Sequence, residues 1–435
     1  MDRHGPDHTG SQPQFPSLQQ GVSALAERWH TDLGGRISSS AAAADGHAYV
    51  GSHDGSLYCL DFETGAVKWR HPTGSPVVSS PAVSDSMVVF TSGVGTLSAL
   101  DAATGNSLWD RTGGYGAASP TVASALGREE GLIYVGSARG TVEALDLDGR
   151  TRWTFEARGA VQSSPSVAGG TVYVGSDDHS VYALDARTGA LRWSTPTKGA
   201  VSAAPAVANG VVYVGSHDAA MYALDAKTGR VLWTHRTGGP IRASVAVGAG
   251  DGPHQRTAYI GSVDGTLYAF DASSGHTQWE RKFKDPIVSS PAVAGEVVYL
   301  GADDSIVALD AHAGQPLWSR QLAGSVTASP TLARSHVIVG SSDRQLYAFG
   351  APAADQRTAR STALMGLPTA AQAPPAEVPA AFSSPAGSCD LRGPLLPGHC
   401  TPRTPFASAG TPFDSTASAV CQPPTAPRRP TADRP

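Results

Sequence analysis

The 435-residue chain is poor in sulfur and in charge: it has four Cys and four Met, and Asp, Glu, Lys and Arg together make up 16% of it. The cysteines are Cys59, Cys389, Cys400 and Cys421, and they form neither a CxxC pair nor a zinc-binding spacing. Nothing in this usage requires an oxidising compartment. Cys59 falls in a predicted strand where sister repeats carry Ala, so it is interpreted as a small buried residue.

Long hydrophobic runs are also missing. No stretch approaches the ~20 apolar residues of a membrane helix, and residues 1–25 lack the apolar core of a signal peptide. We therefore expect a cytoplasmic protein, or a periplasmic or extracellular one if the start codon is mis-assigned. The net charge is −5, and no basic face that could neutralise phosphates is evident, so nucleic acid binding is not expected.

What the chain does contain is a repeat of about 40 residues, visible in SSPSVAGGTVYVGSDDHSVYALDARTGALRWS at 163–194 and AAPAVANGVVYVGSHDAAMYALDAKTGRVLWT at 203–234. All eight Trp fall on it, with successive gaps of 39 to 46 residues. They are Trp29, Trp69, Trp109, Trp153, Trp193, Trp233, Trp279 and Trp318. An SSPAV-like segment likewise recurs eight times, at Ser38, Ser79, Ala118, Ser163, Ala203, Ala243, Ser289 and Ala328.

Each repeat predicts four short strands: A is SSPAV-like, B is VVYVGS-like, C is LYALD-like and D holds the Trp. Gly, Asn and Asp separate A from B and B from C, as hairpin turns require. The first repeat element is a lone D strand around Trp29, and the last stops after strand C at Gly350. One N-terminal strand and three C-terminal strands would complete one blade and leave no open edge. The sequence thus predicts an all-β, eight-bladed β-propeller of four-stranded antiparallel blades.

Domain boundaries follow from composition. Residues 24–350 hold the repeats. Residues 351–435 contain 16 of the 32 Pro and have no periodicity, so this tail is predicted to be disordered, as is the segment 1–23. Two Pro-rich stretches of the tail, PPAEVP and PPTAPRRP, could dock a proline-binding partner, against the simpler interpretation of an inert tail.

The string AxDxxTGxxxW, as in Ala183 to Trp193, resembles the tryptophan-docking motif of the pyrroloquinoline-quinone (PQQ) repeat superfamily, and the resemblance covers residues 24–350. It implies that each indole packs between neighbouring blades, with its N–H on a backbone carbonyl, so the Trp residues are expected to be structural. Within that superfamily, quinoprotein dehydrogenases oxidise alcohols or sugars with PQQ and calcium. Non-catalytic propellers, such as the outer-membrane assembly lipoprotein, bind proteins instead.

The resemblance leaves function open, because one fold hosts many functions. The chain has no Cys–Cys pair of the kind that many of the dehydrogenases stack on the quinone, and it lacks their long insertions. We therefore predict a monomeric, non-catalytic scaffold that binds a protein or peptide on its ring face, with no catalytic residue, cofactor or metal. The alternatives are a PQQ- and calcium-dependent dehydrogenase and a propeller that senses a small molecule.

The best candidate site follows the position that enters strand A. Around the ring this position reads Ile37, Val78, Ala117, Gln162, Ser202, Arg242, Val288 and Thr327. Arg242 and Gln162 break a small or apolar pattern, and Arg36 and Tyr115 lie close to it in sequence. Arginines with an amide and a phenol could bind a carboxylate-bearing ligand at the channel mouth, such as PQQ or an acidic peptide. The simpler alternative is a solvated arginine at the channel lip.

Two other groups of polar residues share the B–C hairpins. The acids there are interpreted as turn formers: Asp54, Asp177, Asp178, Asp218, Asp264, Asp303, Asp304 and Asp343. His53, His179 and His217 lie on separate blades, so a metal site, whose ligands must converge, is not predicted.

Overall fold

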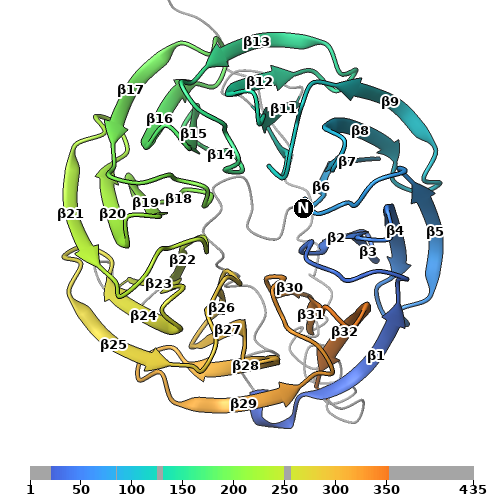
Figure 1. The fold of residues 1–435 in the computed structure, drawn as a ribbon. Coiled ribbons are helices and arrows are strands. Elements are labelled where there is room, and N and C mark those ends of the chain that lie inside the picture. Colours follow the sequence, from blue (N-terminus) through green and yellow to red (C-terminus); the bar gives the residue numbers. More distant parts are fainter. Residues whose placement is uncertain (1–20, 85, 125–130, 249–255, 352–435) are drawn as a thin grey trace, which may run out of the picture. The chain divides into compact units, whose positions relative to one another are not determined.

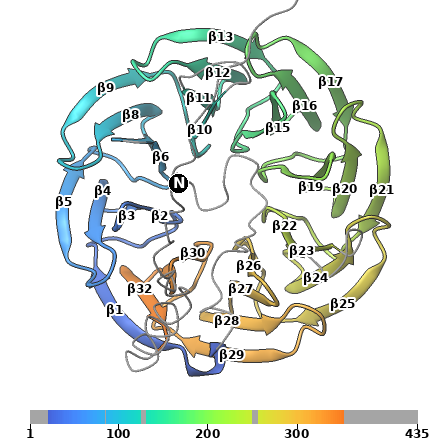
Figure 2. The ribbon, with the colours of Figure 1, turned by 180° about the vertical axis from the view of Figure 1, so that it is seen from behind.

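A computed structural model describes residues 21–84, 86–124, 131–248 and 256–351. Eight four-stranded antiparallel sheets follow one another around a ring, with the shortest strands innermost (Figure 1). Figure 2 shows the same ring from behind. The prediction of an eight-bladed propeller is confirmed. Residues 1–20 of the predicted N-terminal segment and 352–435 of the predicted tail lie outside the described residues.

The first four blades are continuous in sequence, and their strands A to D run outwards from the ring axis. Blade 1 is β2 (Ala42–Ala44), β3 (His47–Ser52), β4 (Ser56–Asp61) and β5 (Val67–Pro72). Blade 2 is β6 (Ala82–Ser84), β7 (Met87–Ser92), β8 (Thr96–Asp101) and β9 (Ser107–Thr112). Blade 3 is β10 (Thr121–Ser124), β11 (Gly131–Gly136), β12 (Thr141–Leu145) and β13 (Thr151–Glu156). Blade 4 is β14 (Ser166–Ala168), β15 (Thr171–Ser176), β16 (Ser180–Asp185) and β17 (Leu191–Pro196).

The next three blades repeat this order, and the eighth joins the two ends of the described chain. Blade 5 is β18 (Ala206–Ala208), β19 (Val211–Ser216), β20 (Ala220–Asp225) and β21 (Val231–Arg236). Blade 6 is β22 (Ala246–Gly248), β23 (Thr257–Gly261), β24 (Thr266–Asp271) and β25 (Thr277–Lys282). Blade 7 is β26 (Ala292–Ala294), β27 (Val297–Ala302), β28 (Ser305–Asp310) and β29 (Pro316–Gln321). Blade 8 is β30 (Thr331–Ala333), β31 (His336–Gly340), β32 (Gln345–Gly350) and β1 (Ala26–Asp32).

Ring closure in blade 8 is made by backbone pairing and by one indole. Strand β1 pairs antiparallel with β32, from Ala26 opposite Gly350 to Asp32 opposite Gln345. A short 3₁₀ helix η1 (Val22–Ala24) precedes β1 and stands where other blades have a C–D turn. Its neighbour Leu25 accepts the indole N–H of Trp318 from blade 7 at 2.9 Å. The closing junction therefore has the same hydrogen bond as the others, although its acceptor lies almost 300 positions earlier in the chain.

Each indole lies at the junction with the following blade. Its N–H donates to a carbonyl at the C–D turn of that blade, or at Leu25 for the last, over 2.8 to 3.1 Å. The turn glycine lies against the ring: a Cβ added at Gly189, where φ is 73°, would come 2.6 Å from Trp153. A register shift between Ala183 and Leu184 leaves Arg192, next to Trp193, without a residue opposite it on strand β16, as in a β-bulge. Each Trp side chain therefore contributes a large apolar area to the junction and also has its one hydrogen-bond donor satisfied.

A second contact joins the inner strands. In seven junctions a strand-B glycine receives a Val or Ile from the segment entering the next blade. The pairs are Gly51 with Val77, Gly136 with Val161, Gly175 with Val201, Gly215 with Ile241, Gly261 with Ile287, Gly301 with Val326 and Gly340 with Ile37. At the eighth junction the sizes are exchanged: Thr91 takes the place of the glycine and Gly116 the place of the apolar residue, and Thr91 Oγ1 donates to the Gly116 carbonyl at 2.9 Å. Because the junction is closely packed, a larger side chain on one blade requires a smaller one on the blade opposite it.

A third contact runs around the ring axis. The residue directly before the strand-A proline, or its equivalent, donates its backbone N–H to a Ser hydroxyl of the next blade, over 2.8 to 3.3 Å. The donors are Ser40, Ser80, Ser119, Ala204, Ser244, Ser290 and Ser329. Seven junctions have this bond; the one after Ser164 faces Ala204, which has no hydroxyl. In the part of the chain that the structure describes, no helix is long and apolar enough to cross a membrane.

The glycine contact yields a stability prediction. A Cβ at Gly215 would lie 2.1 Å from Ile241 Cγ2, so Gly215→Thr forces the junction apart. Overpacking of this kind costs about 1–3 kcal/mol. We expect a lower free energy of unfolding in urea, and partial recovery in the double variant Gly215→Thr/Ile241→Gly, which copies the natural Thr91–Gly116 junction. A double variant that is less stable than Gly215→Thr would contradict this account.

His336 is the one buried histidine whose ring, among the described residues, leaves both nitrogens without a hydrogen bond. It begins β31 and its ring meets the edge of Phe62 from blade 1, with centroids 5.2 Å apart. Burial lowers the pKa of His336, Arg28 and Arg334 lower it further, and Glu63 opposes them. The corresponding residues of blades 5 and 7 are Val211 and Val297, which carry no polar atoms to satisfy.

This histidine predicts a pH dependence of stability. Because the pKa is lowered in the folded state, the unfolded chain binds a proton first as the pH falls below about 6.5. His336 therefore adds no pH-dependent penalty to folding above that pH, and it destabilises the folded state increasingly below it. We expect His336→Val to have a free energy of unfolding about 1–3 kcal/mol higher than the parent, as measured by urea denaturation. It should also lose less of this free energy between pH 7 and pH 5.5. Equal pH slopes for parent and variant would refute the assignment.

Candidate functional site

The B–C turns and the D–A connections lie on one face of the ring, which we call the B–C face; the A–B and C–D turns lie on the other, the A–B face. Hydrogen bonding fixes the repeat register there and corrects the sequence alignment by one residue. Ser40 pairs with Ser80, so the blade 1 equivalent of Val78 is Ser38 and not Ile37. Ile37 is 1% exposed and fills the space beside Gly340, a role that its apolar side chain suits.

A polar cluster occupies this face at the junction of blades 8 and 1. Arg36 Nε donates to His53 Nδ1 at 3.1 Å, and Ser38 Oγ lies 2.8 Å from His53 Nε2. These side chains, with Ile37, Ser325, Thr327 and Ser342, line a cavity of about 240 Å³. The hydroxyls of Ser325 and Ser342 are 3.1 Å apart and hydrogen bonded. A guanidinium beside several hydroxyls is an arrangement suited to a carboxylate or another oxyanion.

The same bonds argue against nucleophilic catalysis by Ser38. A guanidinium remains protonated and only donates, so Nδ1 of His53 must accept, and the neutral ring carries its proton on Nε2. That N–H points to Ser38 Oγ, and His53 cannot act as the base that removes the Ser38 proton. Burial, and next the positive charge of Arg36, lower the pKa of His53, which favours this neutral form.

Blade 5, opposite blade 1 in the ring, repeats the pair. Ser202 Oγ lies 2.9 Å from His217 Nε2. Burial lowers the pKa of His217, exposed Arg242 of the next blade lowers it further, and Asp177 opposes both. Arg242 thus stands near the blade 5 pair much as Arg36 stands near His53, but its guanidinium forms no hydrogen bond or ion pair to any described residue.

The structure places the other two predicted site residues differently. Gln162 is exposed, and its amide donates to Asp177 at 2.7 Å. Tyr115 is 1% exposed: its hydroxyl donates to Glu143 at 3.1 Å and accepts from Arg111 inside the junction of blades 2 and 3. Tyr115 therefore packs in the core and presents no ring to a ligand. Arg36 belongs to the blade 1 cluster and Arg242 to the blade 5–6 side, so the four residues do not form one cluster.

The Asp residues of the B–C turns accept hydrogen bonds from tyrosines. A hydroxyl of strand C donates to the turn carboxylate four residues earlier over 2.6 to 2.8 Å in five blades. The pairs are Tyr58 with Asp54, Tyr182 with Asp178, Tyr222 with Asp218, Tyr268 with Asp264 and Tyr347 with Asp343. Burial and the carboxylate raise the pKa of Tyr58 to about 12. Sequence reasoning missed this partnership, although the Asp-x-x-x-Tyr spacing recurs in the repeats.

These bonds bear on metal binding. Calcium needs six to eight oxygens around one point. Within the described ranges, no three His, Cys, Asp or Glu side chains lie close enough together to hold a metal ion. The ring carboxylates are spread over separate blades and engaged locally, so the described residues do not fit a calcium site of the quinoprotein kind.

Two family models match the chain. The model described as "Beta-alanine-activating enzyme, beta-propeller" matches residues 117–378. The model described as "Outer membrane protein assembly factor BamB" matches residues 20–153. A search of curated proteins found no match.

Solved structures resemble the chain at the level of the fold. BamB from Moraxella catarrhalis is 19% identical with a TM-score of 0.63, and the match covers 75% of this chain and 99% of that one. The quinohemoprotein alcohol dehydrogenase from Comamonas testosteroni is 16% identical with a TM-score of 0.67, and the match covers 79% of each chain. The computationally designed protein Ika8 is 21% identical with a TM-score of 0.62, and the match covers 73% and 98%.

The two Arg–His pairs make a paired prediction about pKa. Arg36→Ala removes a positive charge beside His53, so the pKa of His53 should rise toward its ordinary value while that of His217 stays put. Arg242→Ala should do the reverse. NMR titration of the imidazole signals measures both. Each variant is the control for the other, and a rise of both pKa values in one variant would point to a global loosening instead.

Proposed function

This chain belongs to the β-propeller family described for the β-alanine-activating enzyme, within the PQQ-repeat superfamily, and from that premise we propose a non-catalytic scaffold whose B–C face binds an acidic segment of a protein partner. The observation that carries the proposal is the pair of exposed guanidiniums, Arg36 and Arg242, which meet no carboxylate among the described residues. An arginine that is not consumed by an internal ion pair can bind an external carboxylate.

Rigidity supports this role. Indole, glycine and serine contacts join consecutive blades, so the face is already ordered before a partner arrives, and binding loses little conformational entropy. The hydroxyls of Ser38, Thr327 and Ser342, which line the cavity beside Arg36, add further hydrogen-bond donors. A flexible acidic segment could contact both arginines because each lies on the same face of the ring, on different blades.

A direct binding measurement tests the proposal. The probe is a fluorescein-labelled peptide of six Glu residues, followed by fluorescence anisotropy at low salt. We expect saturable binding by the full chain and at least a tenfold loss, about 1.4 kcal/mol, in Arg36→Ala/Arg242→Ala. Rising salt should weaken the parent more than the variant, because screening acts on the lost charges.

The matched control is Arg230→Ala, which removes an equally exposed arginine from a C–D turn on the A–B face. It should bind the peptide as the parent does. Equal losses in control and double variant would mean that only net charge attracts the peptide, and the proposed site would be abandoned.

The second candidate is an enzyme that oxidises an alcohol with PQQ and calcium. Its support is likeness of fold to a quinohemoprotein alcohol dehydrogenase at 16% identity, and the described residues do not fit its calcium site. This candidate is tested by reconstituting the full chain with PQQ and calcium. A quinone absorbance that co-elutes in gel filtration, together with dye-linked alcohol oxidation, would replace the scaffold proposal. Absence of both leaves the enzyme without support.

A further inference from the structure

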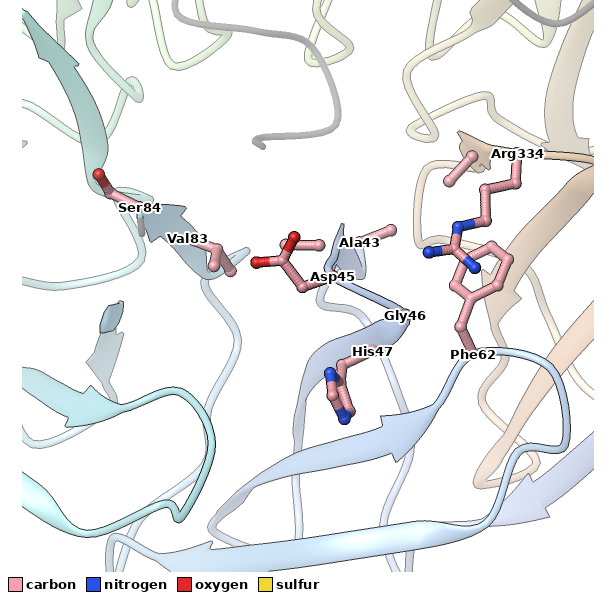
Figure 3. A pocket seen from close by; sticks show the side chains of 10 residues that line it. Ala43, Asp45, Gly46, His47, Phe62, Val83, Ser84 and Arg334 are labelled. Carbon is pink, nitrogen blue, oxygen red and sulfur yellow. The ribbon is translucent and has the colours of Figure 1, made fainter. Parts of the chain in front are cut away.

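A second cavity, larger than the one beside Arg36, lies on the A–B face, opposite the Arg36 cluster. It has a volume of about 450 Å³ and borders blades 8, 1 and 2 at strands β30, β2 and β6 (Figure 3). This size is within the range of small-molecule sites in proteins. One of its walls belongs to blade 8, the blade in which β1 and β32 join the two ends of the described chain.

The walls of this cavity combine an apolar surface with two opposite charges. Phe62, Val83 and Ala333 supply the apolar part. The Asp45 carboxylate and the Arg334 guanidinium come from neighbouring blades and border the same space, as Figure 3 shows. Among the described residues, the Asp45 carboxylate has no hydrogen bond and no ion pair. Asp45 and Arg334 are both exposed, and they lie on different sides of the cavity, Asp45 toward Val83 and Arg334 over Phe62 (Figure 3). Each charge is therefore accessible to a ligand in the cavity.

Arg334 is held in an unusual way. It is the first residue of the β30–β31 turn and has φ of 52°, a left-handed conformation in which Gly, Asn and Asp are preferred. The equivalent turns use Asp45, Gly169, Asn209 and Gly295, with φ between 47° and 56°. An arginine does not favour this turn, although positive φ also occurs at His179, Ala219 and Arg344. The conformation therefore does not by itself single out Arg334, and the contacts of its side chain have to be considered.

Its side chain is placed by blade 1. The guanidinium carbon lies 5.5 Å from the centre of the Phe62 ring, and Nη1 lies 3.6 Å from Glu63 Oε1. Cation–π contact and a single long ion pair use only part of the five donors of the guanidinium. The remaining N–H groups of Arg334 can bind a ligand in the cavity that Arg334 and Phe62 line.

We propose that this cavity binds a small zwitterion with an apolar body, a free apolar amino acid or a dipeptide. Its carboxylate is bound by Arg334, its ammonium group by Asp45, and its apolar side chain packs on Phe62 and Val83. The two opposite charges favour a zwitterion over a ligand with one charge, since a zwitterion can form an ion pair with both Asp45 and Arg334. The site does not depend on the proposed acidic-segment site of the B–C face.

Isothermal titration calorimetry of the full chain with the dipeptide Leu-Leu tests the proposal. Two matched probes remove one charge each: N-acetyl-Leu-Leu lacks the ammonium group, and Leu-Leu amide lacks the carboxylate. We expect saturable binding of Leu-Leu and at least tenfold weaker binding of both capped forms. No saturable binding of Leu-Leu, or equal affinity for the three probes, overturns the proposal.

Variants locate the site. Asp45→Asn and Arg334→Asn both keep a residue suited to the turn and should each weaken Leu-Leu at least tenfold. Asp45→Asn should also lose the preference for Leu-Leu over its acetylated form. Asn209→Asp, a change of charge at the same turn position of blade 5, should bind as the parent does. Arg334→Gly should raise the melting temperature while it removes binding, an outcome that separates loss of the site from loss of the fold. Binding that survives both Asn variants contradicts the assignment.

Discussion

The structure depends on how each blade is joined to the next. A four-stranded sheet of short strands buries little by itself, and eight of them hold together only if every junction is well packed. The chain meets this requirement with the same three contacts at almost every junction: an indole N–H on a carbonyl, a branched side chain over a glycine, and an amide on a serine hydroxyl. Because the contacts repeat around a closed ring, a weak junction cannot relax without disturbing its neighbours.

Much of this could be predicted from the sequence. The Trp spacing and the split final repeat predict eight blades and the closing partner of β1, and both are confirmed. The pairing of Gly215 with Ile241 could not be predicted, because the two residues belong to different repeats and their contact appears only when consecutive sheets are set side by side. The one-residue error at Ile37 has the same origin: blade 1 has three serines in a row, so the motif aligns in two ways, and only the bond from Ser40 to Ser80 decides.

The candidate site was less predictable. Arg36 and Arg242 stand out because each departs from the repeat, and both are exposed. Tyr115 departs from it as well, but its ring packs inward beside Glu143, which stands where sister blades have a strand-C tyrosine. A departure from the repeat can therefore mark either a ligand-facing side chain or one half of an internal exchange. Sequence alone does not distinguish these two cases, because the second residue of an exchange lies in another strand.

Departures from the repeat nevertheless fall into two physical kinds. The exchange of Thr91 for glycine is matched by Gly116 for the branched residue, and that of Glu143 for tyrosine is answered by Tyr115 and Arg111. In both, the packing is restored within the junction. Arg334 and His336 are different: an arginine occupies a left-handed turn position, and a buried imidazole has no partner among the described residues. Neither departure is matched by an exchange in a neighbouring strand, and both residues lie beside Phe62 at the junction of blades 8 and 1. Local departures that the packing does not explain tend to persist where function requires them, and the two at the junction of blades 8 and 1 border the cavity to which we assign a ligand.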